Sequence, residues 1–140
     1  MEFGAIVKTE ICDYGNFITV DMPYAQAVES AKAGLKEEGF GVLCEIDVAK
    51  TMKEKLGVDV EPHVILGACN PSLAHAALEA EANLGLLLPC NVVVRRSGSS
   101  TIIGAVDPRK MLGFVGNPAL DPIGDEAAQR LDRVLERLAR

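Results

Sequence analysis

Along this chain, segments with apolar residues at helical spacing alternate with segments where they occur at every second position, as in a β-strand. This alternation limits the fold more than any other feature of the sequence. After Pro23 apolar residues recur every three to four positions, which predicts an amphipathic helix. In the segment 42–47 every second residue shares a face, which is typical of a β-strand, with Val42, Cys44 and Ile46 on one side. The chain is therefore expected to alternate short strands and helices.

The remaining elements follow from the same spacings and from residues that cap helices. Asp47 is predicted to cap a second helix, and Asn70 with Pro71 begins a third one after a short buried strand at 64–66. The further elements expected are strands at 86–95 and 100–106 joined as a hairpin, a helical turn from Asp107, and a terminal helix through Ala128, Leu131, Leu135 and Leu138. The order β-α-β-α-β-α-β-β-α predicts an α+β fold with one sheet covered by helices.

The domain organisation is simple, because 140 residues suffice for one domain and leave too little chain for a second core. Residues 13–16, Asp-Tyr-Gly-Asn, favour a turn, so residues 1–13 are predicted to form an extended arm or hairpin and residues 14–140 the domain. The N-terminus lacks the pattern of a signal peptide, and no apolar run approaches the roughly 20 residues of a membrane-spanning helix. We therefore expect a cytoplasmic protein.

Charge and cysteine usage exclude several classes of partner. With 14 basic and 20 acidic residues the net charge is −6, which argues against nucleic acid or an anionic membrane surface as the main partner. The cysteines are widely spaced and form no Cys-x-x-Cys pair, so reduced thiols are expected rather than disulfides or a zinc knuckle. They are Cys12, Cys44, Cys69 and Cys90.

Common catalytic motifs are absent from the sequence. It contains no Gly-x-x-x-x-Gly-Lys-Ser/Thr, no Gly-x-Gly-x-x-Gly, no His-Glu-x-x-His and no Gly-x-Ser-x-Gly. ATP hydrolysis, dinucleotide redox chemistry and serine hydrolysis therefore lack their usual motifs. No motif requires a cofactor, although a metal ion is compatible with the residues discussed below.

Several segments together resemble the bacterial and archaeal family known as domain of unknown function 302. The motifs are Gly39–Leu43 with Glu45-Ile46-Asp47, Ile65–Pro71, Ala74-His75, Gly85–Asn91 and Asp107-Pro108, and the match runs from about Tyr14 to Leu138. The resemblance implies a stand-alone α+β domain with a curved, largely antiparallel sheet that forms homodimers and has no assigned activity. Cys44 and His63 depart from the residues expected there, a small hydroxyl and an aromatic one, so neither is treated as a functional residue of the family.

Two cysteines lie where a chemical role is plausible on physical grounds. Cys69 directly precedes Asn70 and a predicted helix N-terminus, where free N–H groups and the helix dipole stabilise a thiolate. Cys90 follows Pro89 in a predicted strand, and a proline there indicates an edge or a bulge that aims the next side chains into a pocket. The preferred interpretation of each is nevertheless a small apolar core residue, because free cysteine is among the most buried residue types.

A wider cluster is predicted if the hairpin lies beside the strand that ends near Leu66. His75, as a base or ligand, and Glu45 would then join Cys69 and Cys90. Such a set suits zinc or another borderline-soft ion, although spacings of six and fifteen residues match no standard metal motif. An ordinary surface role explains His75 as well.

Three functions remain open at this stage. The first is a non-enzymatic binding module for a metal ion, a thiol or sulfur species, or a small apolar molecule near Cys69, Asn70, His75, Cys90 and Glu45. The second is a thiol enzyme with Cys69 as nucleophile, His75 as base and Cys90 as resolving thiol. The third is an interaction protein whose homodimer surface is its function. The first is preferred, because no sequence motif supports catalysis.

Overall fold

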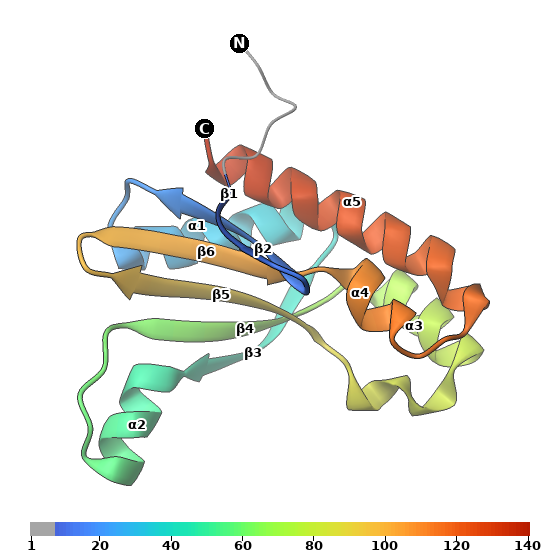
Figure 1. Cartoon of the computed structure of the whole chain (residues 1–140), viewed down its shortest axis with the longest axis horizontal. Helices are drawn as coiled ribbons and strands as arrows, with labels where there is room; N and C mark the ends of the chain where they lie inside the picture. Colours follow the sequence, from blue (N-terminus) through green and yellow to red (C-terminus); the bar gives the residue numbers. More distant parts are fainter. Residues whose placement is uncertain (1–7) are drawn as a thin grey trace.

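The strands join into one antiparallel sheet of order β1-β2-β6-β5-β4-β3 in the computed structural model, which describes residues 8–140 (Figure 1). They are β1 (Lys8–Cys12), β2 (Gly15–Val20), β3 (Gly41–Asp47), β4 (His63–Cys69), β5 (Cys90–Ser97) and β6 (Ser100–Val106). The hairpin expected between the last two strands is present, with Gly98 in the left-handed conformation that its tight turn requires.

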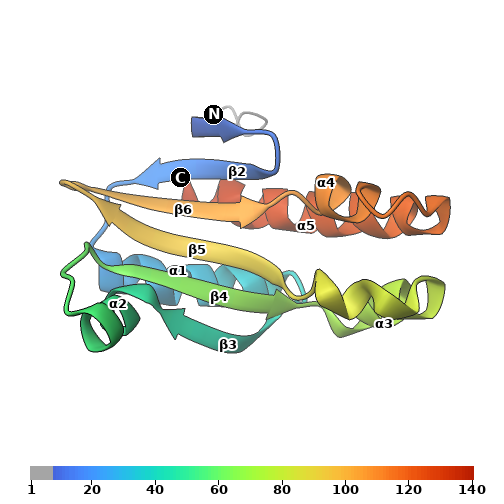
Figure 2. The same ribbon diagram turned by 60° about the horizontal axis from the view of Figure 1, so that its bottom comes forward.

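Helices cover one face of this sheet, so the α+β prediction is confirmed. The helices are α1 (Tyr24–Glu37), α2 (Val48–Leu56), α3 (Pro71–Ala80), α4 (Pro108–Gly113) and α5 (Asp121–Leu138), with short 3-10 helices η1 (Ala82–Leu86) and η2 (Pro118–Leu120). In the turned view of Figure 2, α1 and α5 lie behind the strands, and both contact the sheet and each other. No helix in residues 8–140 has the length and apolar character needed to cross a membrane.

The core lies between the sheet and the two helices α1 and α5. Alternate residues of the central strands point into it, such as Val92 and Val94 of β5, and meet fully buried residues of α1 and α5 such as Leu35 and Leu135. A second, smaller cluster joins α3, η1, α4 and η2 beyond the end of the sheet, and its buried members are Ala77, Leu84, Leu112 and Leu120. This second cluster extends the molecule past the end of the sheet on one side.

The helix caps expected from the sequence are present. The Asp47 carboxylate accepts a hydrogen bond from the Lys50 N–H at 2.9 Å, and the Asn70 side-chain oxygen accepts one from the Leu73 N–H at 3.2 Å. Each bond satisfies one of the N–H groups that have no partner inside the helix. These local signals fix where α2 and α3 begin.

The N-terminal arm differs from its predicted boundary. Residues 8–12 form strand β1, which pairs with β2 through the turn at 13–14, so the sheet begins before residue 14. The hairpin alternative was therefore the right one for this part, because the turn-forming residues bring the two segments side by side. The first seven residues of the predicted arm lie outside the described part of the chain.

The predicted alternation in β3 is wrong at one position. Val42 pairs with Ala68 but Cys44 pairs with Gly67, so one extra residue, Leu43, is inserted in β3. A bulge of this kind moves the following side chains to the opposite face. Val42 consequently packs against the core, whereas Cys44 is exposed on the other side of the sheet.

The strand predicted at 86–95 is also shorter than expected. It begins only at Cys90, and residues 82–86 form η1. Leu84 is buried in the smaller cluster, so its contacts with α3 and α4 favour the helical turn over an extended strand. Pro89 therefore precedes the strand, and β5 is a central strand between β4 and β6 instead of the edge or bulged strand that the proline suggested.

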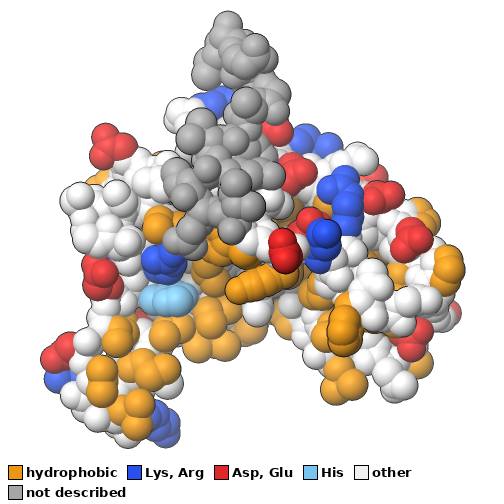
Figure 3. Space-filling view, in the orientation of Figure 1, with side chains coloured by type: hydrophobic (Ala, Val, Ile, Leu, Met, Phe, Trp, Pro, Cys, Tyr) orange, Lys and Arg blue, Asp and Glu red, His pale blue; other side chains and the backbone are white. Residues whose placement is uncertain are grey.

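The face of the sheet turned away from α1 and α5 is called the open face below. One row across it contains Phe17, Gly104, Val93, Ile65 and Ile46, which pair in that order from β2 to β3. Figure 3 shows apolar side chains gathered over this region and over α2. All residues of α2 are at least partly exposed.

Candidate functional site

An apolar cavity of about 240 Å³ lies where the ends of β4 and β5 meet α3, α4 and α5. It contains three of the residues singled out in the sequence, Cys69, Asn70 and Cys90. The other lining residues are Phe40, Leu43, Ala68, Leu73, Ala74, Ala77, Leu78, Leu88, Pro89, Pro108, Met111, Leu112, Ile123 and Ala127. Almost all atoms that line it are apolar, so it is suited to an apolar ligand.

The strand register places the two thiols at this cavity. Cys90 is the first residue of β5 and pairs with Ala68, the neighbour of Cys69 at the end of β4. Asn70 then caps α3, and this fixes the direction in which the helix leaves the sheet and covers the cavity. The strand ends, the cap and the helix together form the wall of the cavity that lies nearest the sheet.

Cys90 is a protonated thiol in this environment. Its side chain is buried, with a relative exposure of 8%. Burial raises the pKa of Cys90 to about 11, and the nearby Cys69 contributes a smaller increase through the repulsion between two thiolates. A neutral thiol behaves as a small apolar group, so Cys90 adds to the apolar character of the cavity.

Cys69 is half-buried at the same cavity, but its expected interaction with the helix N-terminus is not observed. The group that accepts a hydrogen bond from α3 is the Asn70 side-chain oxygen, bonded to the Leu73 N–H. No hydrogen bond to the Cys69 sulfur occurs among the bonds of the described residues, because the asparagine occupies the capping position that follows it.

His75 and Glu45 do not join the cluster that was predicted. His75 lies on the outer side of α3 with 78% of its side chain exposed, and its Nε2 is 3.3 Å from a Glu79 oxygen. Glu45 forms a 2.8 Å ion pair with Lys32 of α1. His75 is thus on the outward side of α3 and Glu45 is held by α1, so neither side chain lines the cavity. Residues 8–140 contain no group of three potential metal ligands.

Sequence reasoning missed most of the residues that form the cavity. Met111 and Leu112 of α4 and Ile123 and Ala127 of α5 line it from segments more than thirty positions after Asn70. The sequence shows that these residues are apolar. It does not show whether they pack in the main core or in the smaller cluster beyond the end of the sheet. Leu43 lines the cavity because the bulge in β3 inserts it there.

Fold and cavity together define a small α+β protein whose sheet and helices enclose an apolar cavity at one end of the sheet. The chain belongs to the family described as domain of unknown function DUF302, whose model matches residues 17–138. The crystal structure of an uncharacterized conserved DUF302 protein from Bacillus stearothermophilus is similar, with a TM-score of 0.84 and 34% sequence identity. That similarity covers 91% of this chain and 99% of the other. No curated protein matches the chain.

Proposed function

We propose that the protein is a binding module that holds a small apolar molecule in the cavity beside Cys69, Asn70 and Cys90. The observation that supports this function is the cavity itself, about 240 Å³ in volume and apolar over almost its whole lining. An apolar cavity of about 150 Å³ in another protein stays dry and binds benzene. By proportion, this one accommodates a ligand of about ten non-hydrogen atoms.

Access from solvent supports the same proposal. Leu43 and Leu78 both line the cavity and are exposed on the protein surface, so they mark its opening. Burial of an apolar ligand here would remove its surface, and part of these two leucines, from water, which stabilises the complex by about 25 cal/mol for each Å² buried.

The same geometry gives less support to a metal ion or a sulfur species as the ligand, and to the hypothesis of a thiol enzyme. Metal binding requires deprotonated ligands, and the raised pKa of Cys90 opposes loss of its proton. His75 does not line the cavity, so a nucleophilic Cys69 would lack the base assigned to it.

All four cysteines are free thiols, which supports a reducing compartment, and we propose the cytoplasm.

The proposal is tested by adding benzene, naphthalene or pyrene to isotope-labelled protein and measuring the change in each amide chemical shift. We expect saturable shifts with benzene and naphthalene, centred on residues that line the cavity, and none with pyrene, whose sixteen carbon atoms exceed the available volume by the benzene scaling. Shifts spread evenly over the surface, or none at all, would show that the cavity binds no apolar molecule.

A second proposal concerns a homodimer, and a different surface supports it. Among the described residues, five large apolar side chains that are exposed come from the segment 43–60, and they are Leu43, Ile46, Leu56, Val58 and Val60. β3 is also an edge strand of the described sheet, so its outer hydrogen-bonding groups are free to pair with the same edge of a second copy. Exposed large apolar side chains that gather in one segment beside a free sheet edge are typical of an interaction surface. Light scattering distinguishes twice the chain mass of 14.9 kDa from the mass itself.

A further inference from the structure

We infer that the cavity selects molecules with a carboxylate at one end of an apolar chain, and that Asn70 and Arg130 bind the carboxylate. This inference rests on the proposed function, because it requires the apolar part of the ligand to occupy the cavity. It adds the chemical class of the ligand and the two residues that give specificity. The evidence comes from Asn70, which lines the cavity, and from the polar groups around its side chain.

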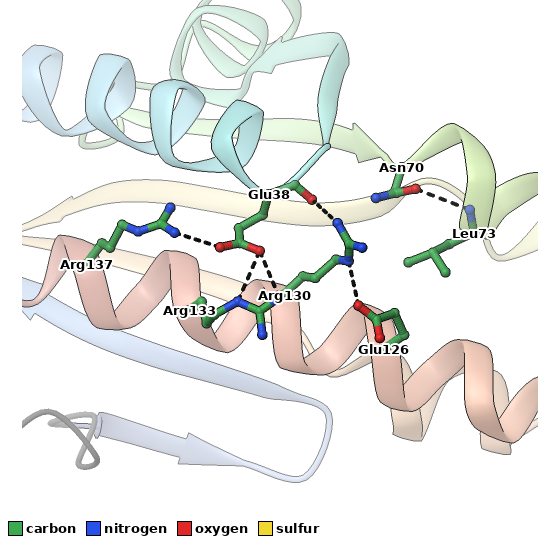
Figure 4. A network of polar contacts seen from close by, with 7 residues as sticks. All are labelled: Glu38, Asn70, Leu73, Glu126, Arg130, Arg133 and Arg137. Carbon is green, nitrogen blue, oxygen red and sulfur yellow. Dashed lines mark hydrogen bonds and ion pairs between the residues drawn. The ribbon is translucent and has the colours of Figure 1, made fainter.

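The Asn70 side chain is held in one orientation by its role as a helix cap. Its oxygen accepts the hydrogen bond from the Leu73 N–H, so its Nδ2 group must point the other way. Figure 4 shows this nitrogen on the side of Arg130 and the oxygen on the side of Leu73. In the described part of the chain, Nδ2 donates no hydrogen bond. The cavity therefore has a free, oriented donor at its margin.

Gly39 shows that the Arg130 guanidinium lies beside this donor. A Cβ atom placed on Gly39 would be 3.0 Å from Asn70 Nδ2 and 3.4 Å from Arg130 Nη1. Both donors thus surround a position that the glycine leaves free. Gly39 also has a φ of +83°, a conformation that residues other than glycine rarely adopt.

The Arg130 side chain is positioned by two other contacts. Its Nε donates to Glu126 at 2.7 Å and its Nη1 to the Glu38 carbonyl oxygen at 3.0 Å. Among the described residues no acceptor is bonded to Nη2, which leaves one N–H face of the guanidinium available. A guanidinium already fixed in place loses little side-chain entropy when it binds a further acceptor.

Asn70 lines the apolar cavity itself, and Arg130 is close in the chain to a residue that lines it. Gly39 precedes Phe40, and Arg130 follows Ala127 by one turn of α5, and both Phe40 and Ala127 line the cavity. An amide donor next to a cation matches a carboxylate, which accepts charge-assisted hydrogen bonds from both. An ammonium head group would instead meet the same two donors, while the nearby Glu126 carboxylate is already paired with Arg130. A linear monocarboxylate of about eight carbon atoms fits the size argued above.

The test compares three ligands with the same eight-carbon chain, namely octanoate, 1-octanol and octylammonium, by calorimetric titration of the intact protein. We expect octanoate to bind about tenfold more tightly than 1-octanol, and octylammonium more weakly than either. Equal affinities for all three would overturn the carboxylate inference and leave the proposed apolar site standing. If none of the three binds, the proposed function fails as well.

One substitution separates the donor from the cap. Asn70→Asp keeps an oxygen for the Leu73 N–H, because aspartate is as good a helix cap as asparagine, but replaces Nδ2 by a negative oxygen. We expect it to weaken octanoate binding about tenfold or more and to weaken 1-octanol binding much less, because only octanoate carries a charge that the new carboxylate repels. Asn91→Asp is the matched control, since Asn91 is exposed and pairs with Gly67 on the open face. An equal loss in both variants would show a general charge effect and refute the role of Asn70.

Discussion

Arg133 donates two hydrogen bonds to a single carboxylate oxygen of Glu38, from Nε at 3.1 Å and from Nη2 at 2.9 Å. The second oxygen of the same carboxylate accepts from Arg137 at 2.7 Å, as Figure 4 shows. Glu38 directly follows α1 and the arginines belong to α5, so these bonds join the two helices that cover the sheet. The Glu38 side chain is only 7% exposed, so loss of its pairing changes the free energy of unfolding more than loss of a surface ion pair does.

The first prediction concerns stability and its dependence on pH. Hydrogen bonding by Arg133 holds the pKa of Glu38 below its ordinary value of 4.5, with the charges of Arg133 and Arg137 acting in the same direction. The stabilisation from this carboxylate is therefore present above about pH 4.5 and is lost as the pH falls through the lower pKa of the folded state. Urea unfolding should show that Glu38→Gln costs about 1–3 kcal/mol at pH 7 and progressively less as the pH is lowered below 4.5.

Glu37→Gln provides the control for this experiment. Glu37 also pairs with Arg137, at 2.9 Å, but its side chain is 64% exposed. We expect the substitution to change the free energy of unfolding by less than about 1 kcal/mol. Equal effects of the two substitutions would contradict a special role for the buried carboxylate.

The second prediction tests the cavity by filling it. Ala74 of α3 lines the cavity, so Ala74→Leu adds three carbon atoms to the space assigned to the ligand. Naphthalene affinity should fall about tenfold or more, while the melting temperature should hold or rise. Ala76→Leu on the same helix adds the same atoms at an exposed position outside the lining and should leave binding unchanged. Unaltered binding by the Ala74 variant would place the ligand elsewhere.

The third prediction follows from the state of the Cys90 thiol. With a pKa of about 11 and a buried side chain, Cys90 should react with iodoacetamide far more slowly at pH 8 than the exposed Cys44. Peptide mapping by mass spectrometry should show Cys44 modified first and Cys90 last. Early modification of Cys90 in the folded protein would mean that its thiol is accessible and ionised.

The fourth prediction concerns the glycine beneath an aromatic ring on the open face. A Cβ atom on Gly104 would overlap the ring of Phe17, which lies directly across from it in β2. Gly104→Ala should therefore lower the free energy of unfolding by about 1–3 kcal/mol through overpacking. In the double variant with Phe17→Ala the clash is absent, so chemical denaturation should give a smaller cost than the sum of the two single substitutions. Additive costs would show that the ring does not determine the effect.

The fifth prediction tests the second copy proposed for the surface 43–60. Leu56 is 69% exposed at the end of α2, so Leu56→Lys should have little effect on folding but should weaken a dimer that buries this side chain. Leu86→Lys is the control, because Leu86 is exposed outside that segment. Light scattering should show dissociation only for the Leu56 variant. A wild-type protein that is monomeric at micromolar concentration would remove the dimer from consideration.

Much of the fold was predictable because its signals are local. The caps at Asp47 and Asn70 and the turn before β6 depend on residues within a few positions, and each appears where the sequence indicates it. The bulge at Leu43 was not predictable in this way. It changes which face the later residues of β3 occupy, and it is visible only in the pairing of β3 with β4.

The sequence by itself determined the kinds of elements, their order and the membership of the chain in an α+β class. It also indicated Cys69, Asn70 and Cys90, which lie at a strand end, a helix cap and a strand start, and the pairing of β4 with β5 brings them to one cavity. Only the tertiary structure decided that His75 and Glu45 point elsewhere and that α4 and α5 complete the cavity. The physical reason is that helices, strands and caps depend on residues close together in the chain, whereas the contacts of a side chain and the lining of a cavity depend on the packing of segments far apart.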